Sequence, residues 1–266
     1  MRLLWVGRAT DPEMARCLGW ARERWPLEQA ATVAEACETE RENAPAVLLV
    51  PLHWSGAVCQ QGLVQLARRW PLAVLVVVVG SGVDGWRRRG PPLAGALAVT
   101  WWELPGRLRL WGRQREAGVA GALGAPATSR REDRLLARVA ADRGWRQPVL
   151  QATVAAGSRL LLEGLEGLAA AAGTRVVDRH QGPPPADAAG DVVLWDVGCV
   201  DEHAVEHLAR LHKARPGRPI VVLESFPRDA SARAVLAAGG AHLLGRPVEA
   251  DVVAETIRWC WQPRLG

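Results

Sequence analysis

The segment 80–85 reads Gly-Ser-Gly-Val-Asp-Gly and follows an apolar run at residues 72–79. This is a G-x-G-x-x-G motif, which in dinucleotide-binding units lies between a strand and a helix and holds a pyrophosphate at the helix N-terminus. Glu103 follows about twenty residues later, near where such units place a ribose-binding acid. However, Gly-Pro-Pro at 90–92 interrupts the helix that the motif requires. We therefore expect a glycine-rich surface turn and no nicotinamide or flavin cofactor.

A second motif, His-Ala-Val-Glu-His, spans His203 to His207 and matches the H-x-x-E-H pattern of one metalloprotease class. The two histidines are four residues apart on a predicted helix, close enough to share a zinc ion, with Glu206 placed as a general base. The apolar side of that helix carries Val205 and Leu208, and no third ligand is evident. We expect solvated histidines and no metal; a metal-dependent hydrolase stays open as an alternative.

Three charged residues follow apolar runs in the second half of the chain: Asp196, Glu224 and Arg246. If these runs are parallel strands, their carboxyl ends meet at one edge of a sheet, where open α/β folds place ligands. One hypothesis is a clamp, in which the Arg246 guanidinium bridges both carboxylates. The alternative is three separate, hydrated groups.

The elements that position these residues alternate regularly in the second half. Its apolar runs are rich in Val, Ile and Leu with little alternation, which is typical of parallel strands covered on both faces. The predicted strands are 147–154, 174–178, 191–196, 218–224 and 241–245, and the predicted helices are 158–172, 201–214, 229–240 and 249–261. Ser158 is the expected N-cap of the first helix.

The first half repeats this order, with Asp11 as N-cap and Pro12 in the first turn of its first helix. The predicted strands are 2–6, 26–31, 46–51, 72–79 and 95–101, and the predicted helices are 11–23, 33–43, 55–69 and 104–116. We expect an α/β protein with two flavodoxin-like, doubly wound, parallel five-stranded sheets in tandem. The predicted domains are 1–118 and 147–266.

Residues 119–146 are predicted to connect the two domains. The stretch 117–128 is rich in Gly and Ala and suits a linker. Residues 129–145 have the pattern of a capped helix, because Ser129 and Glu132 stand at capping-box spacing. This helix either packs between the two halves or forms a dimerisation stripe.

Composition narrows the class of protein. Hydrophobic residues make up 49% of the 266 residues, enough for packed cores, and the net charge is only +5. There is no basic stripe with a nucleic-acid-binding motif, so no nucleic acid is expected. The five cysteines are scattered without a C-x-x-C motif, which favours reduced thiols. No apolar run reaches the length of a membrane span or signal peptide, so we expect a soluble, cytoplasmic protein.

The second half, 147–262, resembles the receiver domains of response regulators in two-component signalling. The segment "DVVLWDVGCVD" resembles the family's third strand and places Asp196 at the phosphoacceptor position. "RPIVVLESF" resembles the fourth strand, which in the family leads to a sensing Thr or Ser. "AAGGAHLLGRPV" is similar to the Ala-Gly turn, fifth strand and Lys-Pro signature, with Arg246 and Pro247 in place of Lys-Pro.

The departures from the family are informative. Receivers carry an acidic pair after the first strand that helps to hold Mg²⁺, but no Asp or Glu lies between Asp142 and Glu163. Glu224 stands at the sensing position, and Ser225 follows one place late. Leu243 replaces the aromatic switch residue. The resemblance is to a degenerate, pseudo-receiver domain.

The first half aligns with the same family more loosely. "AVLLVP" matches "DVVLWD" and places Pro51 at the phosphoacceptor position. "ELPGRL" matches "GRPVEA" and places Leu104 at the Lys position. Gly7 and Arg8 fall where the acidic pair would be. If the first half is a receiver fold, it has lost every chemical residue.

The resemblance implies a regulatory module without catalytic residues, cofactor or metal, acting through protein contacts independently of phosphorylation. It implies a partner surface over 229–261, built from the fourth helix, fifth strand and fifth helix. The partner is another protein or a second copy of the chain. The alternative within the same family is a response regulator phosphorylated on Asp196.

Overall fold

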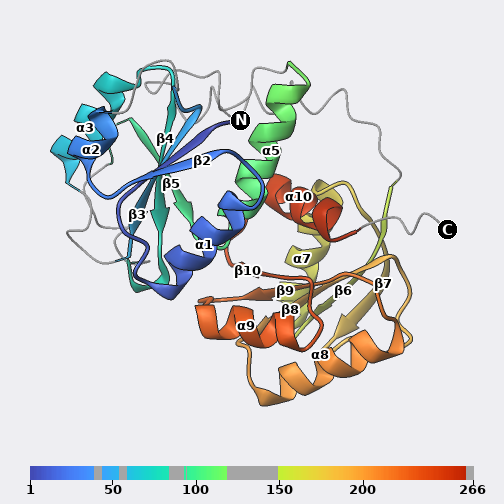
Figure 1. Ribbon diagram of the computed structural model, residues 1–266. Coiled ribbons are helices and arrows are strands. Elements are labelled where there is room, and N and C mark those ends of the chain that lie inside the picture. Colours follow the sequence, from blue (N-terminus) through green and yellow to red (C-terminus); the bar gives the residue numbers. More distant parts are fainter. Residues whose placement is uncertain (39–43, 54–58, 84–92, 94, 119–148, 262–266) are drawn as a thin grey trace. The chain divides into compact units, whose positions relative to one another are not determined.

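The computed structural model describes residues 1–38, 44–53, 59–83, 93, 95–118 and 149–261 (Figure 1). The chain divides into two compact units, unit 1 (Met1–Trp145) and unit 2 (Arg146–Gly266). The predicted connecting helix at 129–145 lies outside the described residues. Among the described helices, none combines the length and hydropathy needed to cross a bilayer.

Unit 1 contains a five-stranded, all-parallel sheet in the order β2-β1-β3-β4-β5. Its described elements are β1 (Leu3–Val6), α1 (Pro12–Arg22), β2 (Leu27–Ala30), α2 (Val33–Glu38), β3 (Val47–Leu52), α3 (Gln60–Arg69), β4 (Val74–Val79), η2 (Ser81–Val83), β5 (Ala96–Thr100) and α5 (Leu104–Glu116). Helices α1 and α5 cover one face of the sheet, and α2 and α3 cover the other (Figure 1). A core of buried, mostly aliphatic side chains lies between the sheet and α2 and α3.

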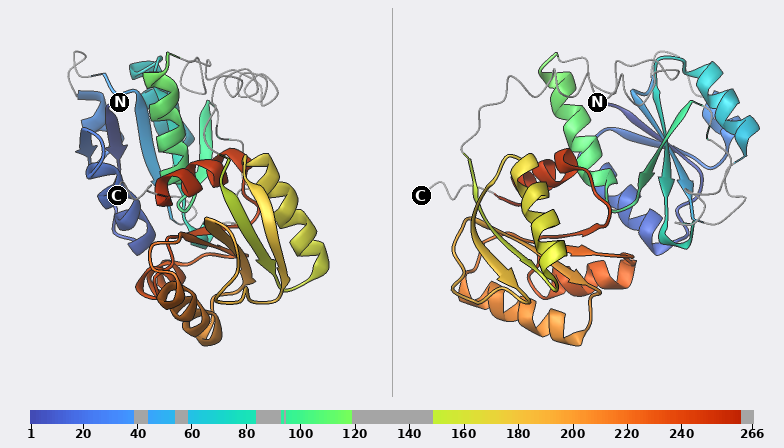
Figure 2. Two further views of the ribbon diagram at one scale, coloured as in Figure 1. Left: turned by 90° about the vertical axis from the view of Figure 1, so that its right-hand side faces the viewer. Right: turned by 180° about the vertical axis from the view of Figure 1, so that it is seen from behind.

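Unit 2 repeats the topology, with the strand order β7-β6-β8-β9-β10. Its described elements are β6 (Gln151–Ala156), α7 (Arg159–Ala171), β7 (Arg175–Gln181), β8 (Val192–Gly198), α8 (Glu202–Ala214), β9 (Ile220–Glu224), α9 (Asp229–Ala237), β10 (His242–Gly245) and α10 (Ala250–Cys260). Helices α7 and α10 lie on one face and α8 and α9 on the other, as the further views show (Figure 2). Its own core lies between the sheet and α7 and α10.

The predicted fold class is confirmed: both units are doubly wound, parallel, five-stranded sheets. The buried runs form strands because parallel strands covered on both faces need apolar side chains on both sides. Two of the predicted caps, Asp11 and Ser158, are also present. The Asp11 carboxylate accepts hydrogen bonds from the backbone of Glu13 and Met14 at the start of α1, and the Ser158 hydroxyl accepts one from Leu161 at the start of α7.

Candidate functional site

Asp196, Ser225 and Arg246 meet at the carboxyl edge of the unit 2 sheet. Asp196 lies near the end of β8, Ser225 directly follows β9, and Arg246 directly follows β10. These three strands are neighbours in the sheet, so their carboxyl ends lie side by side. Two backbone hydrogen bonds hold the ends together, from Ser225 N to Gly198 O (3.0 Å) and from Arg246 N to Glu224 O (2.9 Å).

An ion pair joins two of these side chains. Nη1 of Arg246 lies 2.9 Å from Oδ2 of Asp196, whose side chain is 3% exposed, whereas that of Arg246 is 25% exposed. The other carboxylate oxygen of Asp196 accepts a hydrogen bond from the backbone N–H of Gly198 (3.0 Å). Both oxygens of this buried carboxylate are therefore engaged within the protein.

Burial raises the pKa of Asp196 above the ordinary value of an aspartate. The largest cause is loss of solvent around the charged form, and the Gly198 N–H and the Arg246 charge act in the opposite direction. The ion pair thus only partly compensates for removing this carboxylate from water.

The same guanidinium also holds Ser225. Nη2 of Arg246 donates a hydrogen bond to the Ser225 hydroxyl oxygen (2.6 Å). A hydroxyl group is therefore present beside Asp196 and Arg246, although the sequence alignment places Glu224 at the sensing position and Ser225 one residue late. The bond between Arg246 and Pro247, the last of the predicted switch positions, is cis.

The predicted clamp between Arg246 and two carboxylates is wrong. Glu224 is buried, and its Oε1 accepts hydrogen bonds from the Val200 N–H (2.9 Å) and the Ser231 hydroxyl (3.3 Å). Arg246 pairs with Asp196 and Ser225 instead. Successive side chains of an extended chain point to opposite sides, so Glu224 and Ser225 cannot both face the guanidinium. The carboxylate of Glu224 supports the loop that follows β8.

An acidic pair of the receiver kind is missing from the end of β6. Strand β6 ends in Ala155 and Ala156, and Ser158 after it caps α7. Nowhere in the described parts of the chain do three His, Cys, Asp or Glu side chains gather as metal ligands. The Arg246 guanidinium is the cation that neighbours Asp196.

At the corresponding edge of unit 1, the sheet register identifies the counterparts of Asp196 and Arg246. Pro51 pairs with Val78 as Asp196 pairs with Leu223, so Pro51 occupies the position predicted for it. Thr100 pairs with Val79 as Gly245 pairs with Glu224, which makes Trp101, directly after Thr100, the counterpart of Arg246.

The sequence alignment, which places Leu104 at this position, is therefore wrong by three residues. The backbone bond from Trp101 N to Val79 O (2.9 Å) repeats the bond from Arg246 N to Glu224 O. Pro105 stands five residues after the end of β5, whereas Pro247 stands two residues after the end of β10, so matching the two prolines displaces the alignment by three residues.

Gly7 lies against Pro51 at this edge. Its φ is +129°, and a Cβ on Gly7 would lie 2.9 Å from Cγ of Pro51. The proline ring therefore packs on the glycine at the place where a receiver would bring carboxylates together. Arg8, the second residue predicted at that place, is exposed.

A buried carboxylate from α1 meets the end of β4. Glu13 is 6% exposed, and its two oxygens accept hydrogen bonds from the backbone N–H (2.7 Å) and the hydroxyl (2.5 Å) of Ser81. Ser81 belongs to the glycine motif, whose described part contains the 3-10 turn η2 and is buried except for Gly82. The expectation of a surface turn is thus wrong for residues 80–83, and 84 and 85 lie outside the described residues. Sequence spacing could not find the Glu13–Ser81 contact, because 68 residues separate the two positions.

Around the second chemical motif, the described residues do not bring three potential metal ligands together. His203 is exposed, as expected, but His207 is half-buried. Its ring lies against Trp195, with centroids 5.2 Å apart, and its Nε2 lies 2.7 Å from the carbonyl oxygen of Pro184. The expectation that both histidines are solvated is therefore wrong for His207, which packs against the sheet through Trp195.

No family model and no curated protein matches the chain. Solved structures match it over a share comparable with one unit. A BeF3-activated DrrB receiver domain is 16% identical, with 42% of this chain and 97% of that chain covered and a TM-score of 0.36. A CheY-like response regulator receiver domain protein from Methanospirillum hungatei is 18% identical, covering 42% and 93%, with a TM-score of 0.36.

Chemotaxis protein CheY4 from Vibrio cholerae is 15% identical, covering 42% of this chain and 99% of its own, with a TM-score of 0.36. Identities of this size concern the fold alone. The strand order is the firmer observation, because both sheets are all-parallel and both have the flavodoxin-like order, with the second strand at one edge. The chain contains two units of this flavodoxin-like topology in tandem.

Proposed function

We propose that the chain is a non-enzymatic regulatory module of two tandem pseudo-receiver units, which acts through protein contacts without being phosphorylated. The observation that carries this proposal is the state of Asp196. Its carboxylate is buried, both oxygens are engaged, and the neighbouring cation is a guanidinium of the same chain. A carboxylate in this state is a poor nucleophile toward a phosphoryl donor, and Arg246 occupies the place beside it.

Unit 1 gives the proposal independent support. Its phosphoacceptor position is Pro51, packed on Gly7, and neither residue has a group that accepts a phosphoryl transfer. The five cysteines of the chain are all free thiols, which suits the reducing cytoplasm where we propose that the module works.

The resemblance to receivers suggests α9, β10 and α10 of unit 2 as the partner surface, residues 229–261. Leu236 on α9 is 46% exposed and gives this surface an apolar group. We expect a Leu236→Asp variant to lose a partner that the natural chain captures from extracts of its host. Leu72→Asp in unit 1, where Leu72 is 93% exposed, is the matched control and should retain that partner.

Phosphorylation on Asp196 is the second candidate function. It is favoured by the Ser225 hydroxyl, which Arg246 holds in the same site as Asp196. It is opposed by the missing second carboxylate, since Mg²⁺ binding in proteins relies on hard oxygen ligands that usually include carboxylates.

Acetyl phosphate with Mg²⁺ distinguishes the two functions. We expect the intact mass of the chain to stay unchanged under conditions that label an active receiver domain. Stoichiometric addition of one phosphoryl group, absent from an Asp196→Asn variant that is folded by circular dichroism, would establish the second function and refute the first.

A further inference from the structure

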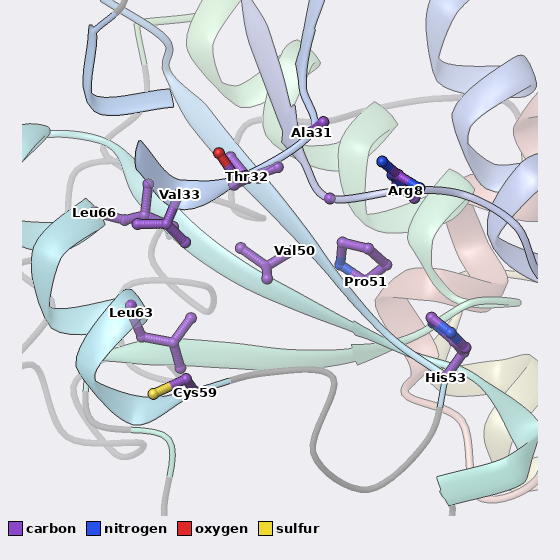
Figure 3. Close-up of a pocket in the computed structure, with 13 residues that line it drawn as sticks. Arg8, Ala31, Thr32, Val33, Val50, Pro51, His53, Cys59, Leu63 and Leu66 are labelled. Carbon is purple, nitrogen blue, oxygen red and sulfur yellow. The ribbon is translucent and has the colours of Figure 1, made fainter. Parts of the chain in front are cut away.

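A cavity of about 420 Å³ lies at the carboxyl edge of the unit 1 sheet, beside the ends of β1 and β3 (Figure 3). This volume lies in the range of small-molecule sites, and the edge is where open α/β sheets bind ligands. Val33, Leu63 and Leu66 from α2 and α3 line one side, and Val50 and Pro51 from β3 line the other. The described walls are thus largely apolar and belong to unit 1.

Polar groups gather on one part of the lining. Figure 3 shows Arg8 and His53 on the same side of the cavity as Pro51, opposite Leu63 and Leu66. Nδ1 of His53 is buried and has no hydrogen-bond partner among the described residues. The described lining residues include one cation, Arg8, and no carboxylate. The electrostatic character of this end therefore favours an anion.

Two glycines of the lining, Gly7 and Gly62, let neighbouring side chains pack closely beside the cavity. Gly7 has a positive φ, and Pro51 packs where its side chain would be. Gly62 on α3 faces Val33, and a Cβ there would lie 3.2 Å from Cγ2 of Val33. The cavity therefore combines a largely apolar lining with the basic side chain of Arg8.

We propose that unit 1 binds a small apolar molecule that carries one anionic group, such as an aryl-substituted or alkyl carboxylate. The apolar part occupies the space between Val33, Leu63 and Val50, and the carboxylate accepts hydrogen bonds from Arg8 and His53. This goes beyond the proposed function, because it gives the module a chemical input that does not depend on phosphorylation of Asp196.

A cysteine at the cavity allows a direct test of location. Cys59 lines the cavity and is exposed, and Cys199 in unit 2 is exposed as well. Both thiols would be alkylated with N-ethylmaleimide, and peptide mapping would give the rate at each. We expect phenylbutyrate to slow the reaction of Cys59 several-fold and to leave that of Cys199 unchanged.

Phenylbutanol and inorganic phosphate separate the two parts of the ligand. The alcohol should protect Cys59 about tenfold more weakly, since it cannot form the charge-assisted bond to Arg8. Phosphate alone should give no protection, because it has no apolar part. Equal protection by phosphate would show an unspecific anion site and overturn the proposal.

Variants complete the test. Arg8→Gln should weaken protection by phenylbutyrate about tenfold and leave that by phenylbutanol unchanged, while Arg115→Gln on the exposed end of α5 serves as the matched control. Val33→Phe should fill the cavity and abolish protection by both compounds. Arg8→Gln alters an exposed side chain, so it decides the matter even if Val33→Phe fails to fold. An unchanged Cys59 rate in the natural chain at millimolar phenylbutyrate would overturn the proposal.

Discussion

At the residue scale, the Asp196–Arg246 pair is asymmetric. The carboxylate is buried and depends on the chain for its partners, whereas the guanidinium is one-quarter exposed and reaches water. Removing the arginine therefore affects stability differently from removing the aspartate. An unpaired buried charge is costly, and a partly exposed one is hydrated instead.

Arg246→Ala should lower the free energy of unfolding by about 1–3 kcal/mol, because it leaves the buried Asp196 carboxylate without its cation. Asp196→Asn should cost less, since the amide oxygen still accepts from Gly198 and Arg246 turns to solvent and Ser225. In the double variant, the effects should be smaller than their sum, because the orphaned charge is gone. Urea unfolding measures all three values.

Arg159 is the matched control for this prediction. It pairs with Glu163 at 2.8 Å, but its side chain is 86% exposed. Arg159→Ala should therefore change stability by no more than about 0.5 kcal/mol. If Arg246→Ala behaves like Arg159→Ala, the pair at the sheet edge is an ordinary surface contact and the argument from burial is wrong.

The pH dependence of stability follows from the raised pKa of Asp196. Its pKa is higher in the folded than in the unfolded chain, so the folded state retains the proton over a pH range in which the unfolded state has lost it. The contribution of Asp196 to stability is thus most favourable below the unfolded value of about 3.9, and it is lost as the pH rises through the folded pKa. Asparagine does not titrate in this range.

We therefore expect Asp196→Asn to gain stability relative to the natural chain as the pH rises from about 4 to about 7. Urea unfolding of both proteins across this range measures the difference, from which other titrating groups largely cancel. A difference that falls with rising pH would mean that Arg246 outweighs burial and that the pKa of Asp196 is lowered.

At the element scale, most of the architecture could be predicted from the sequence because local signals agree with the fold. The parallel strands are short apolar runs, and the helices begin at side chains that cap them, such as Asp11 and Ser158. Helix α5 was predicted as 104–116 and spans Leu104–Glu116. These signals act over a few residues, so a single sequence contains them.

The candidate site was only partly predictable, because its contacts depend on how strands end rather than on where they lie. Because side chains alternate along a strand, a shift of one residue decides whether Ser225 or Glu224 is expected to face Arg246. Strand boundaries predicted from sequence carry errors larger than one residue. A register shift in β8 between Asp196 and Gly198 adds to the problem. Trp101 escaped detection as the counterpart of Arg246 for a different reason, because the sequence match pairs Pro105 with Pro247.

Two glycines in unit 2 differ in what an added side chain would meet. Gly164 lies in the exposed face of α7, where a Cβ would meet nothing within 4 Å, whereas Gly190 has a φ of +95° and backbone atoms 3.0 Å from its Cβ position. Gly164→Ala should stabilise the protein by about 0.8–1 kcal/mol, because alanine has the higher helix propensity. Gly190→Ala should destabilise it, since an L side chain there is strained and crowded.

Thermal unfolding of the two glycine variants shows whether each substitution raises or lowers the stability of the protein. Gly167→Ala, one turn further along α7 and equally open, should repeat the gain at Gly164. A loss at both helix positions would indicate that the exposed face of α7 is covered in solution.

At the scale of the whole molecule, the two units share a topology but differ at their sheet edges. Unit 2 closes its edge with an ion pair between strands, whereas unit 1 packs Pro51 on Gly7 and leaves a cavity beside it. The strand order is set by apolar runs that both units retain. The edge residues could therefore diverge without a change of fold, and the two units can serve different purposes in one chain.

Each unit also contains a core drawn from its own strands and helices, and this leads to a prediction about the isolated parts. The unit 2 core joins residues of β6, β8, β9 and β10 to α7 and α10, all within Arg146–Gly266. A unit of this size buries enough surface to fold without the other. We expect a fragment of residues 146–266 to unfold in one cooperative transition.

Arg246→Ala should lower the stability of the fragment by the same amount as in the full chain, because Asp196, Ser225 and Gly198 all lie within unit 2. Urea unfolding, followed by far-UV circular dichroism and by tryptophan fluorescence, measures both effects. A fragment without a cooperative transition would show that unit 2 needs unit 1 to fold, and a smaller effect of Arg246→Ala in the fragment would show that unit 1 contributes to the environment of the ion pair.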